Sequence, residues 1–280
     1  MMTNDNRQTI PFTKMQGAGN DFVVVNNTKQ LFSQNTLIEL TPKLCDRKYG
    51  VGSDGLLALC RAEQDEADYT MFYRNPDGSD AGMCGNGARC IALFARTLGF
   101  GEEHTFNVHD RLYRAIVTGD HEVRISFPVE TSVNEIMVNN RKMWELNTGT
   151  EHVVVAVDSD TLQQKDHLRE DGETLRYHSA FQPRGTNVNF ISGIHESKLR
   201  LQTYERGVEN LTLACGTGAI ASALAWHHLE KPTRPRQPYE VITEGGVLRI
   251  YFKYNPQTLT YSNLELEGPA HFVFEGSYFI

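Results

Sequence analysis

Two cysteines stand in closely similar strings that lie almost half of the 280-residue chain apart. Cys84 opens the string Cys-Gly-Asn-Gly-Ala-Arg, and Cys215 opens the string Cys-Gly-Thr-Gly-Ala-Ile. Both strings contain Cys-Gly-x-Gly-Ala, and both run into an alanine-rich stretch that predicts a helix. The repetition predicts two similar halves, each of which presents one cysteine at the N-terminus of a helix.

A cysteine at a helix N-terminus is suited to acid–base chemistry. The unpaired backbone N–H groups there carry a partial positive charge, which stabilises a thiolate and lowers the pKa of the thiol. The glycines that follow each cysteine allow these N–H groups to approach a bound anion such as a carboxylate. Two such sites facing one carbon would remove a proton from one face and deliver a proton to the other.

The alternative interpretation of these cysteines is structural, because cysteine often behaves as a small buried apolar residue. We interpret Cys45, Cys60 and Cys90 in that way, since they lie within helix or strand patterns without flanking glycines. For Cys84 and Cys215, the structural alternative is that a glycine-rich turn contains a cysteine by chance. Such a coincidence is less expected for two matched strings than for one. No Cys-x-x-Cys pair or compact His/Cys cluster accompanies Cys84 or Cys215, so no metal site is predicted.

Other polar residues are candidates for binding a ligand. Arg206 could donate two N–H groups to a carboxylate and Glu205 could accept from an ammonium group, although an exposed ion pair is the structural alternative. His152 begins an apolar strand, where a packed histidine and an active-site histidine fit equally well. Single asparagines are typical of turns, but together four of them would supply neutral contacts to a zwitterion: Asn20, Asn75, Asn86 and Asn187.

The elements that must position these residues are mostly strands. Strands are predicted at residues 10–15, 22–25, 56–60, 69–74, 104–117 and 121–127, and again at 152–157 and 199–205. Two further strands are predicted within 239–252, on either side of a turn at residues 244–246. Helices are predicted at residues 36–47 and 158–172, and after each cysteine to about residues 98 and 229. The stretches 88–95 and 219–226 are apolar nearly all round, which is typical of enclosed helices. We therefore predict an α/β (α+β) chain of two β-rich halves, each wrapped around one buried helix.

Composition and charge limit the protein's class and partners. The length suggests about two domains, which we place at residues 10–128 and 129–265, with a frayed tail at residues 1–9 and a proline-rich loop at 231–238. A net charge of −8 argues against nucleic acid and anionic membranes as partners. Five cysteines do not form a secreted disulfide framework, and no signal or membrane-spanning segment is recognisable. A cytoplasmic protein with reduced thiols is expected.

Six motifs, taken together and in this order, resemble the diaminopimelate epimerase family. They are Gly-Ala-Gly-Asn-Asp-Phe (17–22), Asn-Pro-Asp-Gly-Ser (75–79), Cys-Gly-Asn-Gly-Ala-Arg-Cys (84–90), Gly-Thr-Asn-Val-Asn-Phe (185–190), Tyr-Glu-Arg-Gly (204–207) and Ala-Cys-Gly-Thr-Gly-Ala (214–219). The resemblance implies a cofactor-independent isomerase that interconverts LL- and meso-2,6-diaminopimelate for lysine and peptidoglycan biosynthesis. It also implies two pseudo-symmetric halves with the active site in the cleft between them, a C-terminal strand (266–280) that returns to the first half, and a homodimer as a common assembly.

The resemblance also assigns roles to residues. It implies that Cys84 and Cys215 act as acid and base and that His152 lies near the reacting centre, with Glu205 supporting the site. The positions that would contact the substrate are Asn20, Asn75, Gly85, Asn86, Asn187, Glu205, Arg206, Gly216 and Thr217.

Two places depart from the pattern usual in the family. Where the family usually has Gly-Asn-Pro-His or Gly-Ser-Pro-His, this chain has Gly149-Thr150-Glu151-His152, so that Glu151 replaces a proline that stiffens the turn. Gly55 stands where many members carry glutamine. Three alternative functions remain: a racemase or epimerase of another amino acid, a non-catalytic amino-acid-binding protein, and a thiol redox sensor.

Overall fold

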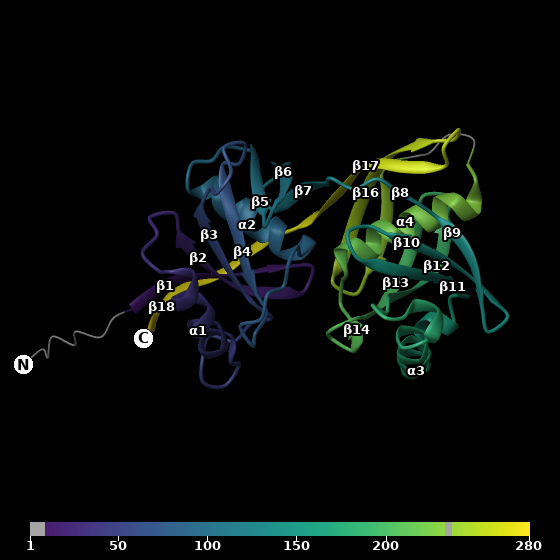
Figure 1. The fold of residues 1–280 in the computed structure, drawn as a ribbon, viewed down its shortest axis with the longest axis horizontal. Helices are drawn as coiled ribbons and strands as arrows, with labels where there is room; N and C mark the ends of the chain where they lie inside the picture. The colour runs from purple at the N-terminus through teal and green to yellow at the C-terminus, as the bar shows by residue number, and fades with distance from the viewer. Residues whose placement is uncertain (1–8, 233–236) are drawn as a thin grey trace, which may run out of the picture. The chain divides into compact units, whose positions relative to one another are not determined.

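The computed structural model of the chain describes residues 9–232 and 237–280, in two compact units. The first unit contains the chain up to Val123 together with Ala270–Ile280, and the second contains Arg124–Pro269 (Figure 1). Most of the predicted N-terminal tail and the middle of the predicted loop at 231–238 lie outside the described residues. Within the described ranges, no helix is long and apolar enough to cross a membrane.

The first unit is a curled sheet with two helices. Its neighbouring strands follow the order β18-β1-β2-β3-β4-β5-β6. The elements are β1 (Thr9–Gly17), β2 (Asn20–Asn27), α1 (Gln34–Cys45), β3 (Leu56–Arg61), β4 (Tyr69–Arg74), α2 (Gly85–Thr97), β5 (Glu103–Val108), β6 (Arg111–Val117) and the C-terminal β18 (His271–Phe279). The strand β7 (Glu122–Phe127) spans the division between the two units.

The second unit contains the remaining strands and two α-helices. Its main strand order is β9-β10-β11-β12-β13-β15-β16-β17. The elements are β8 (Thr131–Ser132), β9 (Asn134–Val138), β10 (Arg141–Asn147), β11 (Glu151–Ala156), α3 (Lys165–Arg176), β12 (Asn187–His195), β13 (Lys198–Glu205), β14 (Asn210–Thr212), α4 (Gly216–Glu230), β15 (Tyr239–Thr243), β16 (Gly246–Asn255) and β17 (Thr260–Pro269). Short 3-10 turns lie at Thr161–Gln163 and Ser179–Phe181.

The two units repeat one pattern of strand pairing. Along β1-β2-β3-β4-β5-β6 the pairs are antiparallel, parallel, antiparallel, parallel and antiparallel. The series β10-β11-β12-β13-β15-β16 shows the same alternation. Each parallel pair needs a crossover connection, and a helix lies in each: α1 and α2 in the first unit, α3 and α4 in the second. This repetition confirms the predicted pair of similar β-rich halves.

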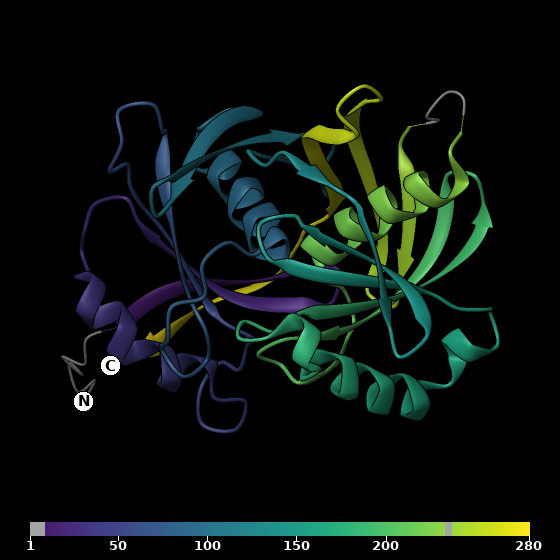
Figure 2. The ribbon, with the colours of Figure 1, turned by 45° about the vertical axis from the view of Figure 1, so that its right-hand side comes forward.

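A buried helix lies at the centre of each unit. The helix α2 contacts β1, β2, β3, β4 and β6, and residues 85–95 of this helix are all buried. The helix α4 contacts seven strands of its own unit, from β10 to β17, and is buried over most of its length (Figure 2). The prediction that both alanine-rich helices are enclosed is therefore confirmed.

Two predicted elements were wrong in detail. Residues 104–117 form a hairpin of β5 and β6 instead of one strand, because His109 adopts a left-handed backbone (φ 52°) and turns the chain between Val108 and Arg111. The helix predicted at 158–172 begins only at Lys165 and continues to Arg176. The Asp158 side chain accepts hydrogen bonds from two following N–H groups and holds the preceding residues in a separate turn.

Candidate active site

Cys84 occupies the N-cap position of α2, as the sequence pattern predicted. Its backbone is extended (φ −119°, ψ 117°), and its sulfur accepts a hydrogen bond from the Gly87 N–H at 3.4 Å. The first intrahelical hydrogen bond joins the Ala88 N–H to the Cys84 carbonyl at 2.8 Å, which leaves the preceding N–H groups outside the helical ladder. A half-buried sulfur that accepts from an N–H at a helix end is stabilised as a thiolate.

Asn20 provides the second partner of the Cys84 sulfur. In its thiol form Cys84 donates to Asn20 Oδ1 at 3.8 Å. Asn20 Nδ2 donates to Asp54 Oδ2 at 2.7 Å, and Asp54 pairs with Arg47 at 2.7 Å. Because the Asp54 carboxylate can only accept, the Asn20 amide group faces Asp54 and its oxygen faces the sulfur.

Arg89 fixes the first turn of α2 from inside the unit. Its side chain is fully buried, and it donates to Asn86 Oδ1 at 2.8 Å and to the Gly85 carbonyl at 3.2 Å. Burial lowers the pKa of Arg89, and its interactions with the thiols of Cys90 and Cys84 act in the opposite direction. Sequence reasoning did not assign Arg89 a role, although an arginine within the apolar stretch 88–95 was a usable signal.

Asn75 lies in the turn that follows β4. Its side chain donates to Ser79 Oγ at 3.1 Å and to the Asp80 carbonyl at 3.4 Å. Among the described residues, the hydrogen bonds of this carboxamide stay within the turn. The structure thus brings Cys84, Gly85, Asn86 and Asn20 together but gives Asn75 no hydrogen bond to them.

Gly55 has no room for the side chain that is usual in the family. A β-carbon at this position would overlap the ring of Tyr73 and approach the carbonyl oxygen of Arg74. The Gly55 carbonyl accepts from the Val23 N–H at 3.1 Å and from the Ser53 hydroxyl at 3.0 Å. The Tyr73 ring therefore occupies the space in which a longer residue 55 would begin.

Cys215 occupies the N-cap position of α4, also as predicted. Its backbone (φ −112°, ψ 115°) closely matches that of Cys84, and the residue is only 6% exposed. Its sulfur lies 3.7 Å from the Thr217 hydroxyl oxygen. The Thr217 carbonyl in turn accepts from the Thr148 hydroxyl at 2.9 Å, which ties the first turn of α4 to the loop between β10 and β11.

Glu205, the last residue of β13, is a hydrogen-bond partner of the Cys215 thiol. Burial raises the pKa of Glu205 above its usual range, and the neighbouring Thr212 hydroxyl and Cys215 thiol oppose that rise. A carboxylate with a raised pKa that touches a thiol is suited to take its proton and return it.

His152 lies fully buried on β11 and is held at both ring nitrogens. Asn189 Nδ2 lies 3.1 Å from His152 Nδ1, and the Thr150 hydroxyl oxygen lies 3.0 Å from Nε2. Because Asn189 Nδ2 also donates to the Val153 carbonyl and Asn189 Oδ1 accepts from Thr203, the amide orientation is fixed. Nδ1 therefore accepts, and the ring proton is on Nε2. Burial, with a smaller effect of the Arg206 charge, lowers the pKa of His152 to about 3.

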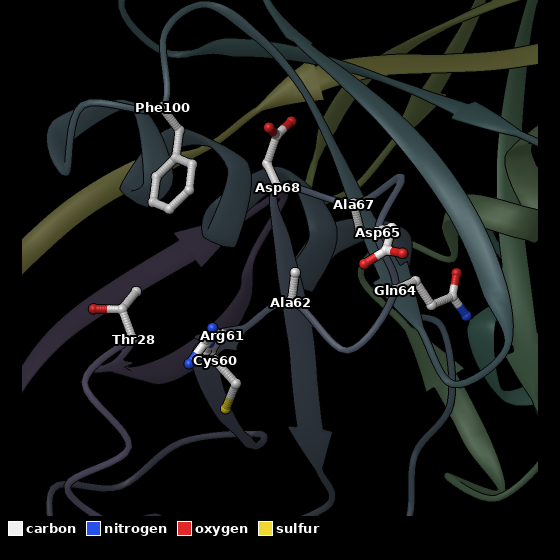
Figure 3. Close-up of a pocket in the computed structure, with 9 residues that line it drawn as sticks. All are labelled: Thr28, Cys60, Arg61, Ala62, Gln64, Asp65, Ala67, Asp68 and Phe100. Atoms are coloured by element: carbon white, nitrogen blue, oxygen red, sulfur yellow. The ribbon is translucent and has the colours of Figure 1, made fainter.

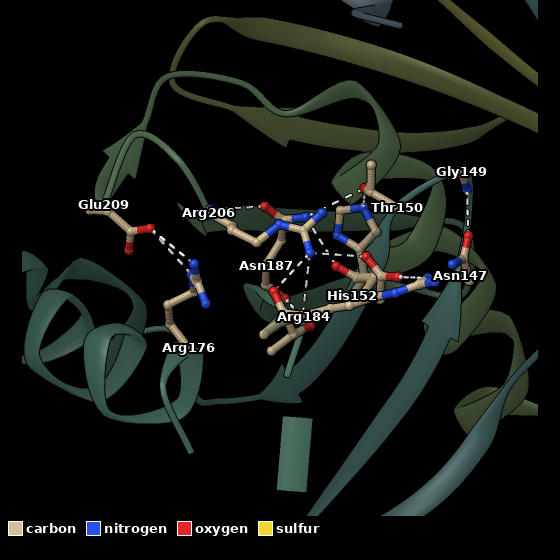
Figure 4. Close-up of polar contacts among 12 residues, drawn as sticks. Asn147, Gly149, Thr150, His152, Arg176, Arg184, Asn187, Arg206 and Glu209 are labelled. Atoms are coloured by element: carbon tan, nitrogen blue, oxygen red, sulfur yellow. Dashed lines mark hydrogen bonds and ion pairs between the residues drawn. The ribbon is translucent and has the colours of Figure 1, made fainter. Parts of the chain in front are cut away.

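Arg206, Asn187 and Glu151 are linked to one another. The Arg206 N–H donates to Asn187 Oδ1 at 2.9 Å, and Asn187 Nδ2 donates to the Glu151 carbonyl at 3.0 Å. The Glu151 carboxylate accepts from Arg206 Nη1 at 3.0 Å and from Arg184 Nη1 at 2.8 Å (Figure 4). Partial burial raises the pKa of Glu151, but the hydrogen bond from Arg184 and the charge of Arg206 lower it below its ordinary value.

Sequence reasoning missed three residues that hold the predicted ones in place: Asn189, Asp54 and Arg89. Asn189 lies two residues after Asn187 on β12, so that both side chains point to the same face of the strand. That spacing was a readable signal for Asn189. Asp54 gave no such signal, because its contact with Asn20 joins residues far apart in the chain.

A cavity elsewhere in the first unit contains none of the predicted site residues. It has a volume of about 400 Å³ and an open mouth, and it is lined by Thr28, Cys60, Arg61, Ala62, Gln64, Asp65, Ala67, Asp68 and Phe100 (Figure 3). In the part of the chain that the structure describes, no group of three His, Cys, Asp or Glu residues is arranged to hold a metal ion.

Comparisons with known sequences identify close relatives over nearly the whole chain. The sequence model of the family described as diaminopimelate epimerase matches residues 12–112 and 145–273. The diaminopimelate epimerase of Flavobacterium psychrophilum is 37% identical over 265 residues, which are 94% of this chain and 97% of that protein. The diaminopimelate epimerase of Chlorobaculum tepidum is 37% identical over 267 residues, 94% of this chain and 99% of the relative.

Solved structures share the fold at low sequence identity. A phenazine biosynthesis protein of the PhzF family from Bacillus anthracis aligns with a TM-score of 0.74 and 13% identity, over 98% of this chain and 100% of that one. A hydroxyproline epimerase from Agrobacterium vitis aligns with a TM-score of 0.70 and 14% identity, over 99% and 94% of the two chains. These similarities confirm the predicted strand-rich α/β fold class.

Proposed function

Because the chain belongs to the diaminopimelate epimerase family, we propose that Cys84 and Cys215 are the acid and the base of the reaction. The activity of the protein is the epimerisation of diaminopimelate, an isomerase reaction that fits lysine biosynthesis. We propose that it interconverts the LL and meso forms by moving a proton at one α-carbon.

In the proposed step, one sulfur enters as a thiolate and the other as a thiol. The thiolate takes the α-proton, so that the C–H bond breaks and its electron pair moves into the adjacent carboxylate, which becomes enolate-like. The S–H bond of the second cysteine then breaks, and its proton forms a new C–H bond on the opposite face. The two sulfurs exchange protonation states in each turnover, and the reverse reaction uses them in the opposite order.

The observation that carries this proposal is that each sulfur has partners suited to both of its protonation states. The Cys84 thiolate accepts from the Gly87 N–H, and the Cys84 thiol donates to Asn20 Oδ1. The Cys215 thiol has the Glu205 carboxylate as its acceptor, and the Thr217 hydroxyl lies close enough to donate to the thiolate. A structural cysteine requires no such set of partners, whereas an acid–base cysteine must be stable in both forms.

The difficult part of the reaction is the weak acidity of a carbon beside a carboxylate. The N–H groups of the first turns of α2 and α4 lie outside the helical ladder and are aimed beyond the helix end. We propose that these groups, at Gly85-Asn86 and Gly216-Thr217, hold the reacting carboxylate as its charge increases. A preorganised donor of this kind contributes about 2.7–4 kcal/mol to the stability of a transition state.

The remaining polar residues are assigned to the distant end of the substrate. Arg206 offers guanidinium N–H groups to the second carboxylate, and Asn187 and Asn75 offer neutral polar groups to the zwitterion. His152 stays neutral and supports the site through Thr150 and Asn189. We further propose that the enzyme works in the cytoplasm, since the mechanism requires both thiols in the reduced state.

The proposal is tested by removing each sulfur. Cys84→Ala and Cys215→Ala are each expected to reduce the rate of epimerisation by at least about a thousandfold, as for loss of an essential catalytic group. Their circular dichroism spectra should match that of the wild-type protein. Epimerisation by either variant at near wild-type rate would rule out the two-thiol mechanism.

A further inference from the structure

We propose that Glu151 positions the Arg206 guanidinium so that one of its edges stays open for the second carboxylate of the substrate. This inference rests on the proposed function, in which Arg206 binds that carboxylate. It concerns a residue that replaces the proline usual at this position of the family motif. The proline side chain carries no acceptor that could hold an arginine, so this arrangement requires a residue with a side-chain acceptor at position 151.

The guanidinium of Arg206 is held through a single nitrogen. Nη1 donates to Glu151 Oε2 at 3.0 Å, to the Arg184 carbonyl at 3.0 Å and to the Gly185 carbonyl at 3.5 Å. Among the residues that the structure describes, Nε and Nη2 of Arg206 make no hydrogen bond. The Arg206 side chain is 27% exposed.

The open edge has the geometry that a carboxylate requires. A guanidinium binds a carboxylate best through two parallel N–H groups, and the Nε and Nη2 atoms form one such pair. Glu151 occupies the opposite end of the group instead of the edge itself. The contacts therefore orient Arg206 while keeping its bidentate edge available.

A closed ring of hydrogen bonds keeps Glu151 in place. The Glu151 side chain accepts from Arg206, the Arg206 backbone N–H donates to Asn187, and the Asn187 side chain donates back to the Glu151 carbonyl. Arg184 holds the other carboxylate oxygen of Glu151 from the solvent side, with 77% of its own side chain exposed (Figure 4). Backbone and side chain of Arg206 are thus both linked to residue 151, which limits the rotamers of a long side chain.

An opposite role for Glu151 would also involve an ion pair. A carboxylate beside Arg206 could compete with the substrate and weaken its binding. Because Glu151 contacts only Nη1 of Arg206, the positioning role is favoured. The two roles predict opposite changes in substrate affinity when the Glu151 side chain is removed.

The experiment compares Glu151→Ala, Glu151→Gln and a control, Glu135→Ala. Glu135 forms an ion pair with Lys142 at 2.8 Å in the same unit and contacts none of the site residues named above. KM and kcat for diaminopimelate are measured for each variant. The dissociation constant is measured by calorimetry in a Cys215→Ala background, in which no turnover is expected to complicate binding.

Glu151→Ala is expected to raise KM and the dissociation constant about tenfold, which corresponds to about 1.4 kcal/mol, while kcat changes less than about twofold. Glu151→Gln should recover most of this loss, because the glutamine oxygen still accepts from Nη1. The binding of lysine, which has the same chain with only one carboxylate, should be unaffected by Glu151→Ala. Glu135→Ala should bind diaminopimelate as the wild-type protein does.

Three results would overturn the proposal. Unchanged binding in Glu151→Ala would remove the positioning role, and tighter binding would show that Glu151 competes with the substrate. Equal weakening of diaminopimelate and lysine would show that residue 151 acts only on the structure. Failure of the two-thiol mechanism is recognised separately, as turnover that persists in the Cys215→Ala protein, and the KM values of the residue 151 variants then still test the positioning role.

Discussion

The side-chain oxygen of Asn189 lies against Gly218, so close that a β-carbon at residue 218 would overlap it. The same β-carbon would also lie 3.2 Å from the sulfur of Cys215. Asn189 holds His152 and Thr203 through its other contacts. Glycine at residue 218 therefore allows the helix that carries Cys215 to approach the strand network behind it.

Gly218→Ala is accordingly expected to lower both the unfolding free energy of the protein and its rate of epimerisation. Alanine usually favours a helix over glycine by about 0.8–1.0 kcal/mol, but the overlap with Asn189 should reverse the sign and cost about 1–3 kcal/mol. Gly87→Ala, at the equivalent position of α2, meets only the flexible ends of Leu57 and Met71 at 3.2–3.3 Å and should cost less. Urea unfolding of both variants measures the difference. Equal stability of the two variants would contradict this account.

Glu205→Gln tests whether the carboxylate exchanges a proton with Cys215. Glutamine keeps the shape and an acceptor but cannot take the thiol proton, so kcat should fall by about 10²–10⁴-fold. The thermal midpoint should not fall, because burial already disfavours the ionised carboxylate at this position. Glu244→Gln, which alters an ion pair with Lys165 in the same unit, serves as the control. A fully active Glu205→Gln variant would exclude Glu205 as a proton acceptor.

His152 should make the stability of the protein sensitive to acid. Its pKa is about 3 in the folded protein and 6.5 in the unfolded chain, so between these values only the unfolded chain binds a proton there. The contribution is complete above pH 6.5 and is lost as the pH falls, at about 1.4 kcal/mol per pH unit. From pH 7 to pH 5, the wild-type protein should lose about 2 kcal/mol more unfolding free energy than His152→Gln. Parallel losses in both proteins would show that His152 is not buried in the neutral form.

Arg89→Met separates stability from the reactivity of Cys84. Replacing a buried charge by an apolar side chain of similar size is often neutral for stability, although the Gly85 and Asn86 acceptors lose a donor here. The unfolding free energy should therefore change by less than about 2 kcal/mol. Alkylation of Cys84, followed by mass spectrometry of its peptide, should slow markedly because a nearby positive charge is lost. In the control variant Arg96→Met, which alters the last turn of the same helix, Cys84 should be alkylated at the wild-type rate. Alkylation of Cys84 at the wild-type rate in Arg89→Met would refute the role of Arg89.

The features that were predictable from the sequence are local ones. The Cys-Gly-x-Gly-Ala strings and the alanine-rich stretches after them placed both cysteines at helix N-termini, because capping and helix formation depend on a few adjacent residues. The hairpin at His109 was not predicted, since neither glycine nor asparagine marks that turn.

The contacts that hold the candidate site depend on the register of the sheets and were not predictable. The parallel pairing of β11 with β12 sets His152 beside Asn187 and Val154 beside Asn189, which makes the Asn189–His152 contact feasible. The Glu151–Arg206 pair joins residues that are distant in sequence in the same way. No short motif encodes such a register, so the partners of Asn189 and Glu151 emerge only from the fold.

The most direct test of the two-thiol mechanism is the fate of the α-hydrogen during the first few per cent of turnover in deuterated water. LL-diaminopimelate is incubated with the enzyme and a thiol reductant, and substrate and product are separated and weighed by mass spectrometry. Two bases predict that the product carries one solvent deuterium at the epimerised carbon, while the recovered substrate carries almost none. Product that retains the original hydrogen, or deuterium that accumulates equally in substrate and product, would contradict transfer between two different sulfurs.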